Sequence, residues 1–182
     1  MPQRLDTALL RLMRTRGHAP PVEESAKALA RSGEYGAIWF AIGLTAAAFD
    51  PPRRNHWLAA AALAPAAIGV NFGVKLLARR QRPVLRGLPP LGGAPSSLSF
   101  PSAHSTSSFA AAAAMARIAP RKAPLLYSGA TAIALTRPYL GMHYPTDVLV
   151  GAALGLALGK LVPGLEDNPP AAEAGASERG SR

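Results

Sequence analysis

Hydrophobic positions along the chain fall into five blocks that are rich in Ala and Leu. Polar segments containing Pro and Gly separate the blocks, as helix breakers do. A helix that spans a membrane needs about 20 mostly apolar residues, and only the second block reaches that length. The blocks cover residues 35–49, 57–78, 107–116, 124–136 and 147–162. The pattern predicts an all-α protein with five core helices.

The short blocks carry almost no charge and contain many Gly, Ala, Ser and Thr residues, which let membrane helices approach closely. In the whole chain 49% of residues are hydrophobic and only 16% are charged. A soluble bundle would need Lys and Glu on its exposed faces. We therefore expect an integral, multi-pass helical bundle in the cell membrane, with a soluble bundle as the alternative.

The amino-terminal stretch "MPQRLDTALLRLMRTRG", residues 1–17, is basic and amphipathic, and it lacks the apolar centre of a signal peptide. It predicts a helix at the membrane interface, facing anionic headgroups. The alternative is a solvated helix packed on the end of the bundle. A second short helix is expected at residues 22–32, ending at the Ser-Gly pair 32–33.

The expected organisation has three parts. Residues 1–33 form the amphipathic helices, 34–165 the membrane domain, and 166–182 a polar, disordered tail. If each block spans the bundle, the loops 82–101 and 137–145 lie at one end. The Lys and Arg residues are divided too evenly between the two ends for the positive-inside rule to orient the protein.

The net charge of +10 raises the question of nucleic acid as a partner. The basic residues are scattered through the loops, without the interleaved aromatic residues that stack on bases. We expect the lipid bilayer and an anionic substrate as partners, and no nucleic acid. Cysteine is absent, and no His or carboxylate cluster has metal-ligand spacing. The sequence therefore predicts no metal and no cofactor.

The stretch "SFPSAHSTSS", residues 99–108, stands directly before an alanine-rich block. Pro101 and Ser102 are suited to the turn and N-cap of a helix. The free N–H groups of such a helix start also bind phosphate, which here would lie beside His104. On this stretch alone both interpretations remain open.

Cations gather in "KLLARRQRP", residues 75–83. Lys75 and Arg82 are seven residues apart, so two helical turns would bring both to one side of a helix end. Two such cations near a membrane favour an anion between them. Arg79, Arg80 and Arg86 are interpreted instead as a basic collar whose charges reach the interface.

The segment "TRPYLGMHYPTD", residues 136–147, supplies a further cation and an acidic partner for histidine. The guanidinium of Arg137 has a forked shape that matches phosphate. Asp147 follows His143 by four residues, close enough to accept its Nδ1 proton and leave Nε2 free as a nucleophile or base. A single histidine is more often structural, but two histidines, three cations and an aspartate at one end indicate a functional site.

These residues resemble the three-part signature of the type 2 phosphatidic acid phosphatase superfamily. The match consists of Lys75 with Arg82-Pro83, then Pro101-Ser102-Ala103-His104, then Thr136-Arg137 with His143 and Asp147. Ala103 stands where the family usually has glycine and Thr136 where it usually has serine, and each retains the backbone N–H or the hydroxyl. The stretches "SGEYGAIW" and "GMHYPTDVLVGA" are similar to small actinobacterial members proposed to act on decaprenylphosphoryl-5-phosphoribose.

The resemblance implies a membrane lipid phosphatase that needs no metal. It implies that His143 is the nucleophile that forms a phosphohistidine, that Asp147 orients it, and that His104 is the acid and base. It also implies phosphate contacts from the remaining motif residues: Lys75, Arg82, Ser102, Ala103 and Arg137. Undecaprenyl diphosphate, phosphatidic acid and phosphatidylglycerol phosphate are alternative substrates. A vanadate-dependent haloperoxidase and a non-catalytic membrane protein are the alternative classes; the short apolar chain and the intact histidines argue against them.

Overall fold

A computed structural model describes residues 2–162, and these residues are almost entirely helical. The α-helices are α1 (Pro2–Thr15), α2 (Pro20–Ser32), α3 (Ala37–Phe49), α4 (Arg54–Ala78), α5 (Ala103–Ile118), α6 (Ala123–Tyr139) and α7 (Pro145–Lys160). Short 3-10 helices precede three of them: η1 (Glu34–Gly36), η2 (Pro51–Arg53) and η3 (Pro120–Lys122). Within 2–162 the only β pairing is an isolated bridge between Gln81 and Leu98. The expected tail, 166–182, lies outside the described residues.

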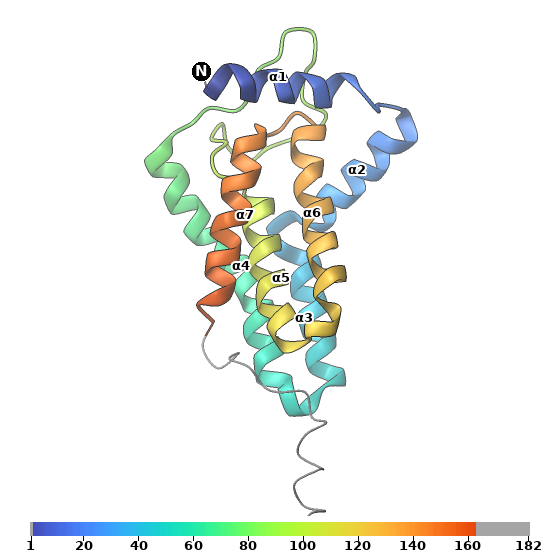
Figure 1. Ribbon diagram of the computed structural model, residues 1–182, viewed down its shortest axis with the longest axis vertical. Coiled ribbons are helices and arrows are strands. Elements are labelled where there is room, and N and C mark those ends of the chain that lie inside the picture. Colours follow the sequence, from blue (N-terminus) through green and yellow to red (C-terminus); the bar gives the residue numbers. More distant parts are fainter. Residues whose placement is uncertain (1, 163–182) are drawn as a thin grey trace, which may run out of the picture.

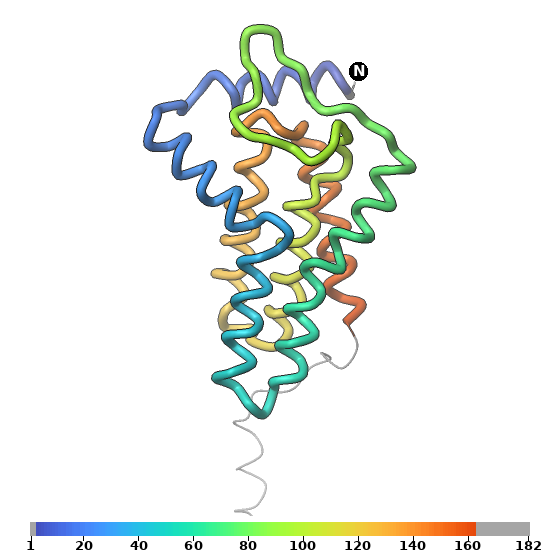
Figure 2. The backbone as a smooth tube through the Cα atoms, turned by 180° about the vertical axis from the view of Figure 1, so that it is seen from behind, coloured from blue at the N-terminus to red at the C-terminus, as the bar shows by residue number. Residues whose placement is uncertain are grey.

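Helix α5 occupies the centre of the bundle, with α3, α4, α6 and α7 around it (Figure 1; Figure 2). Its alanine run 110–114 is buried on every side, because alanine lets neighbouring helices approach closely from several directions. The larger core side chains include Trp39 and Ile133 from the surrounding helices and Met115 from α5 itself. Trp39 donates its indole N–H to Ser108 Oγ at 2.9 Å, which satisfies two polar groups inside the core.

Helix α7 packs on α5 through a row of glycines, Gly151, Gly155 and Gly159, spaced four residues apart. A Cβ atom at Gly155 would lie 2.4 Å from the carbonyl oxygen of Thr106. The backbones therefore approach more closely than any side chain permits. This contact fixes the start of α7, and with it Asp147, against the start of α5.

The loops alternate between the two ends of the bundle, as the sequence predicts. The long 79–102 connection and the α6–α7 loop lie at one end, and η2 and η3 lie at the other (Figure 1; Figure 2). Helix α1 lies across the first end, roughly perpendicular to the bundle. We call this the active end, because the functional side chains described below gather there.

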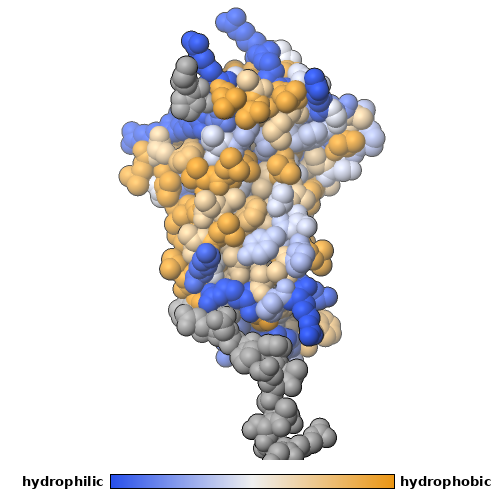
Figure 3. Space-filling model, in the orientation of Figure 1, coloured by the Kyte–Doolittle hydropathy of each residue, from blue (hydrophilic) through white to orange (hydrophobic). Residues whose placement is uncertain are grey.

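Apolar side chains cover much of the sides of the bundle, whereas charged side chains gather near its ends (Figure 3). Large hydrophobic side chains point outward from several helices, among them Leu77, Leu125 and Leu149. Large exposed apolar patches mark contacts with a membrane or with another protein. Among residues 2–162, one helical stretch, Pro51–Ala78, is long and apolar enough to cross a membrane.

Two element boundaries differ from the sequence prediction. Helix α4 ends at Ala78, because Arg79 adopts a left-handed conformation with φ 48°, so Arg82 does not lie on the helix that carries Lys75. Helix α6 continues through Pro138 to Tyr139, so Arg137 belongs to the last turn of a helix rather than to a loop. The predicted short helix at 22–32 is present and begins at Pro20.

Candidate active site

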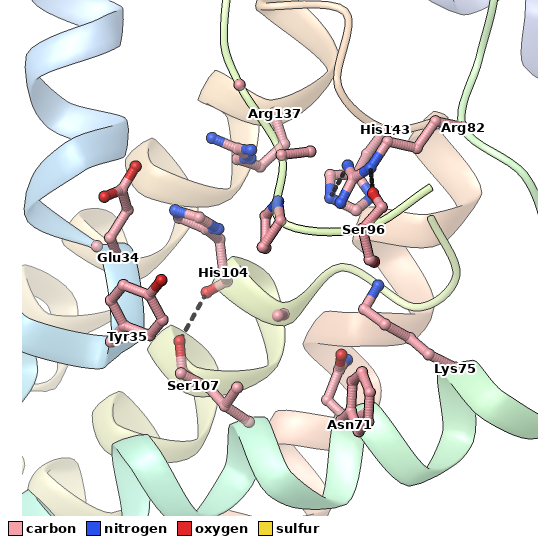
Figure 4. A pocket seen from close by; sticks show the side chains of 17 residues that line it. Glu34, Tyr35, Asn71, Lys75, Arg82, Ser96, His104, Ser107, Arg137 and His143 are labelled. Carbon is pink, nitrogen blue, oxygen red and sulfur yellow. Dashed lines mark hydrogen bonds between the residues drawn. The ribbon is translucent and has the colours of Figure 1, made fainter. Parts of the chain in front are cut away.

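A cavity of about 420 Å³ opens at the active end, and the three predicted motifs meet in it. Figure 4 shows Glu34 and Tyr35 at one side of this cavity, Arg82, His143 and Lys75 at the other, and His104 between them. Helix α4 contributes Lys75, the following loop Arg82, the start of α5 Ala103 and His104, and α6 Arg137. Residues as far apart in the chain as Gly33 and His143 thus line the same cavity.

His143 is buried, and its two ring nitrogens face different partners. Nη1 of Arg82 lies 3.0 Å from His143 Nε2. Because a guanidinium only donates, Nε2 accepts and the proton of the neutral ring resides on Nδ1. Nδ1 faces Asp147 Oδ2 at 3.6 Å, an ion-pair distance that is long for a hydrogen bond. The heavy-atom geometry matches the predicted tautomer, although His143 Nδ1 does not make the predicted hydrogen bond to Asp147.

Burial lowers the pKa of the His143 imidazole to about 3, and the charges of Arg82 and Arg137 act in the same direction, against the effect of Asp147. Burial also lowers the pKa of the Arg82 guanidinium, against the opposing charge of Asp147. Cationic groups crowded into a desolvated cavity favour an anion there. The neutral Nε2 retains the lone pair that a nucleophile needs.

Asp147 is fully buried, and hydrogen bonds hold both of its carboxylate oxygens. Oδ2 accepts from Ser99 Oγ at 2.7 Å and from the backbone N–H of Tyr144 at 2.9 Å. Oδ1 accepts from Arg80 Nη1 at 2.8 Å. With these partners the carboxylate cannot rotate away from His143 without losing hydrogen bonds.

Lys75 donates to three carbonyl oxygens of the segment that leads into α5: Leu98 at 3.4 Å, Ser99 at 3.1 Å and Pro101 at 2.7 Å. Its ammonium therefore fixes the Pro101–His104 segment while placing a positive charge at the cavity wall. Lys75 and Arg82 line the same cavity, as predicted, but not because they are two turns apart on one helix. Lys75 lies on α4, and the loop that follows α4 brings Arg82 back to the cavity.

His104 contacts the end of α2. Its Nε2 lies 3.1 Å from the carbonyl oxygen of Ala30, so Nε2 carries a proton and Nδ1 is the other titratable position. Gly33 makes this approach possible, because a Cβ there would lie 3.2 Å from His104 Cδ2 and 2.7 Å from Ile133 Cγ2. The amino-terminal helices thus position a motif residue of the bundle.

Arg137 is only 6% exposed, and its Nε has no hydrogen-bond partner among the described residues. A buried guanidinium donor without a partner is costly, and a bound anion would remove that cost. Thr136 beside it is buried, and its hydroxyl donates to Ile133 O at 2.6 Å. Arg137 is the cavity cation with the most unused hydrogen-bonding capacity.

The structure bears on both interpretations of the stretch before α5, a helix cap and a phosphate-binding helix start. Ser102 is the N-cap of α5, and its Oγ accepts from the N–H of Ser105 at 3.4 Å. It is fully buried and does not line the cavity, whereas Ala103 does. The capping prediction is confirmed, and the hydroxyl of Ser102 is engaged inside the helix start.

The interpretation of Arg80 as part of an exposed collar is wrong. Its neighbour Arg79 is exposed, and among residues 2–162 its side chain donates only to Leu76 O of its own helix. Arg80 instead turns inward, bridging two carboxylates and lying 4.1 Å over the ring of Tyr144. Sequence reasoning also missed Ser99. No local signal marks either residue, because their partners lie about 50 residues or more away in the chain.

The fold and the site together define a class of protein: a helical bundle with a cationic cavity that holds two histidines at one end. The PAP2 superfamily model matches residues 55–168, which is more than half of the chain. The chain belongs to the PAP2 superfamily.

Curated relatives and a solved structure agree with this assignment. The chain is 41% identical to decaprenylphosphoryl-5-phosphoribose phosphatase of Mycobacterium tuberculosis over 143 residues, covering 79% of this chain and 80% of the relative. It is 39% identical to the protein of that name from Mycolicibacterium smegmatis, covering 82% of each. The crystal structure of a transmembrane PAP2 type phosphatidylglycerolphosphate phosphatase from Bacillus subtilis superposes with a TM-score of 0.70 at 24% identity, covering 99% of this chain and 88% of that one.

Proposed function

We propose that this protein is a multi-pass membrane lipid phosphatase that hydrolyses a phosphomonoester through a phosphohistidine. The observation that carries the proposal is the cavity itself, where Arg82 and Arg137 flank a neutral, buried His143 whose Nε2 already accepts a hydrogen bond. The apolar sides of the bundle support a membrane location. The bilayer then brings lipid substrates to the active end.

In the proposed first step, His143 Nε2 attacks phosphorus and the ester P–O bond breaks. The leaving oxygen takes a proton from Nδ1 of His104, which must start this step as the imidazolium because Nε2 keeps its own proton on the Ala30 carbonyl oxygen. Asp147 stabilises the positive charge that develops on the His143 ring. The negative charge on the phosphoryl oxygens is stabilised by the N–H groups at the start of α5 and by three cations, Lys75, Arg82 and Arg137.

In the second step, water attacks the phosphohistidine and the P–N bond breaks. His104 takes the proton from this water, which restores its starting state, and inorganic phosphate leaves. The reacting residues are two histidines among cations. Among residues 2–162 no group of three His, Cys, Asp or Glu side chains is placed to hold a metal ion. We propose that the reaction needs no metal.

The proposed substrate is decaprenylphosphoryl-5-phosphoribose, which the relatives' name indicates. The cavity offers groups suited to its parts. Hydrogen-bonding groups for the sugar hydroxyls come from Glu34, Tyr35 and Ser96. An apolar wall of the cavity is formed by Ile68 and Phe72. Phosphatidic acid, phosphatidylglycerol phosphate and undecaprenyl diphosphate lack the pentose that these polar groups would bind.

The test is release of inorganic phosphate by purified protein in detergent, without added metal, from a panel of these four lipids. We expect the highest kcat/KM on decaprenylphosphoryl-5-phosphoribose. Preference for phosphatidic acid or phosphatidylglycerol phosphate would replace the substrate and keep the reaction class, whereas preference for undecaprenyl diphosphate would change the bond broken to a phosphoanhydride. Hydrolysis of none of them, by protein shown to be folded, would contradict the proposed function.

A further inference from the structure

Asp6, on the amphipathic helix α1, is a buried carboxylate that the proposed mechanism does not use. It is 3% exposed, although a helix at a membrane surface has ample room to expose a charged side chain. Asp6 Oδ2 accepts from Arg80 Nη2 at 2.6 Å, and Oδ1 accepts from the backbone N–H of Thr146 at 3.1 Å. Asp6 is therefore engaged with two other segments of the chain.

Arg80 continues the connection toward the cavity. One terminal nitrogen contacts Asp6, and the other donates to Asp147 Oδ1 at 2.8 Å and to Thr146 Oγ1 at 2.7 Å. The guanidinium thus bridges a carboxylate of α1 and the carboxylate that faces His143. A planar guanidinium can make such a two-sided bridge, whereas an ammonium cannot reproduce its geometry.

Further contacts seat α1 on the same end of the bundle. Leu10, one turn after Asp6, is fully buried and packs with Leu85 and Tyr144. Arg14, one turn further, donates to Pro89 O at 2.8 Å and Tyr139 O at 3.4 Å. One face of α1 therefore contacts the 79–102 connection and the α6–α7 loop, the two segments that carry Arg82 and His143.

We propose that Asp6 and Arg80 are positioning residues for Asp147, so that α1 is part of the catalytic apparatus. This inference rests on the proposed function, in which Asp147 orients His143. Arg80 holds Oδ1 while Ser99 and Tyr144 hold Oδ2, and Asp6 in turn fixes the orientation of Arg80. Without this bridge the carboxylate loses its only side-chain partner on Oδ1 among residues 2–162, and its alignment with His143 Nδ1 loosens.

The test compares Arg80→Gln with Arg79→Gln, since both remove one positive charge from adjacent positions. Asp6→Asn is paired with Arg11→Gln, an exposed site on the same helix. We expect Arg80→Gln to lower kcat at least tenfold and Asp6→Asn at least threefold, with KM changed less than twofold. Both controls should stay within twofold of wild type, and Arg80→Lys should be intermediate.

A double-mutant comparison separates positioning from general folding. In an Asp147→Asn background, which retains residual activity, Arg80→Gln should cost less than threefold, because the group that it positions has already been altered. An equal loss in both backgrounds, or equal kcat values for Arg80→Gln and Arg79→Gln, would overturn the proposal. If Arg80→Gln does not fold, the isosteric Asp6→Asn decides by the same comparison. Wild-type protein without lipid phosphatase activity would instead contradict the proposed function.

Discussion

Arg82 Nη1 lies 3.0 Å from His143 Nε2 and also donates to Met142 O at 2.8 Å. The same guanidinium therefore fixes the loop that carries the histidine and marks the side of the ring from which phosphorus would approach. A phosphoryl group at Nε2 would bring its oxygens to Arg82 in place of this hydrogen bond. The contact is thus consistent with a cavity arranged for a tetrahedral anion.

The depressed pKa of His143 predicts a particular dependence of stability on pH. Its folded value of about 3 lies below the ordinary 6.5, so between these values the unfolded chain binds the proton more readily. Stability should fall as pH drops from about 6.5 toward 3, by at most about 1.4 kcal/mol per pH unit from this group. Thermal unfolding in detergent at pH 7 and pH 5 should show a larger decrease for wild type than for His143→Asn. Equal decreases for the two proteins would contradict a lowered pKa of His143 in the folded state.

Asp147→Asn should lower kcat by about 10² to 10⁴, as in other sites where a carboxylate orients a histidine. The amide keeps the size of the side chain but cannot stabilise the charge that develops on His143. Phosphate release from the best lipid of the panel measures the effect. A loss below threefold would mean that another group orients His143.

His104→Ala should affect substrates according to their leaving group. An alkyl leaving group needs a proton from His104, whereas an aryl leaving group departs with little help. We expect a larger loss in the first turnover of an alkyl phosphate than in that of an aryl phosphate. His143→Ala, as the matched comparison, should abolish turnover of both while the protein stays folded. The same fractional loss on both substrates would remove His104 from the acid role.

Orthovanadate should inhibit in competition with the lipid, because its five-coordinate form at His143 Nε2 resembles the transition state. EDTA should have no effect. Arg137→Lys keeps the charge but loses the fork, and should weaken vanadate inhibition about tenfold or more, since a hydrogen bond to a charged group contributes about 1.5–3 kcal/mol. Inhibition by EDTA that Mg²⁺ reverses would indicate a metal-dependent enzyme. Unchanged vanadate inhibition in Lys75, Arg82 and Arg137 variants would place the phosphate site elsewhere.

Gly155→Ala should destabilise the bundle, because the new Cβ would lie 2.4 Å from Thr106 O and 2.9 Å from Ala110 N. Backbone atoms cannot move aside cheaply, so we expect a cost of about 1–3 kcal/mol. Gly69→Ala in α4 is the control, since a Cβ there meets no atom within 4 Å. Thermal unfolding in detergent should show a lower midpoint for Gly155→Ala than for wild type. The midpoint of the control should not decrease. Equal midpoints would argue against the α5–α7 contact.

Much of this arrangement could be predicted from the sequence, because the core helices coincide with apolar blocks and the cations and histidines of the cavity lie in three short motifs. Lys75, His104, Arg137 and His143 meet in the cavity as expected. Arg80 could not be distinguished from Arg79, since local sequence does not show which of two adjacent arginines turns inward. That choice depends on the left-handed turn at Arg79 and on acceptors supplied by distant helices.

Asp6 accepts hydrogen bonds from both the backbone N–H and the hydroxyl of Thr146, a residue 140 positions away, and these bonds bear on the order of events during synthesis. The ribosome makes α1 before the other described helices, so Asp6 cannot bond to Thr146 until nearly the whole bundle has been synthesised. Lys75 and His104 are likewise synthesised well before His143 and Asp147. A nascent chain therefore carries Lys75 and Arg82 before it contains His143 and Asp147, and in the proposed mechanism it cannot hydrolyse lipid until α7 has been made.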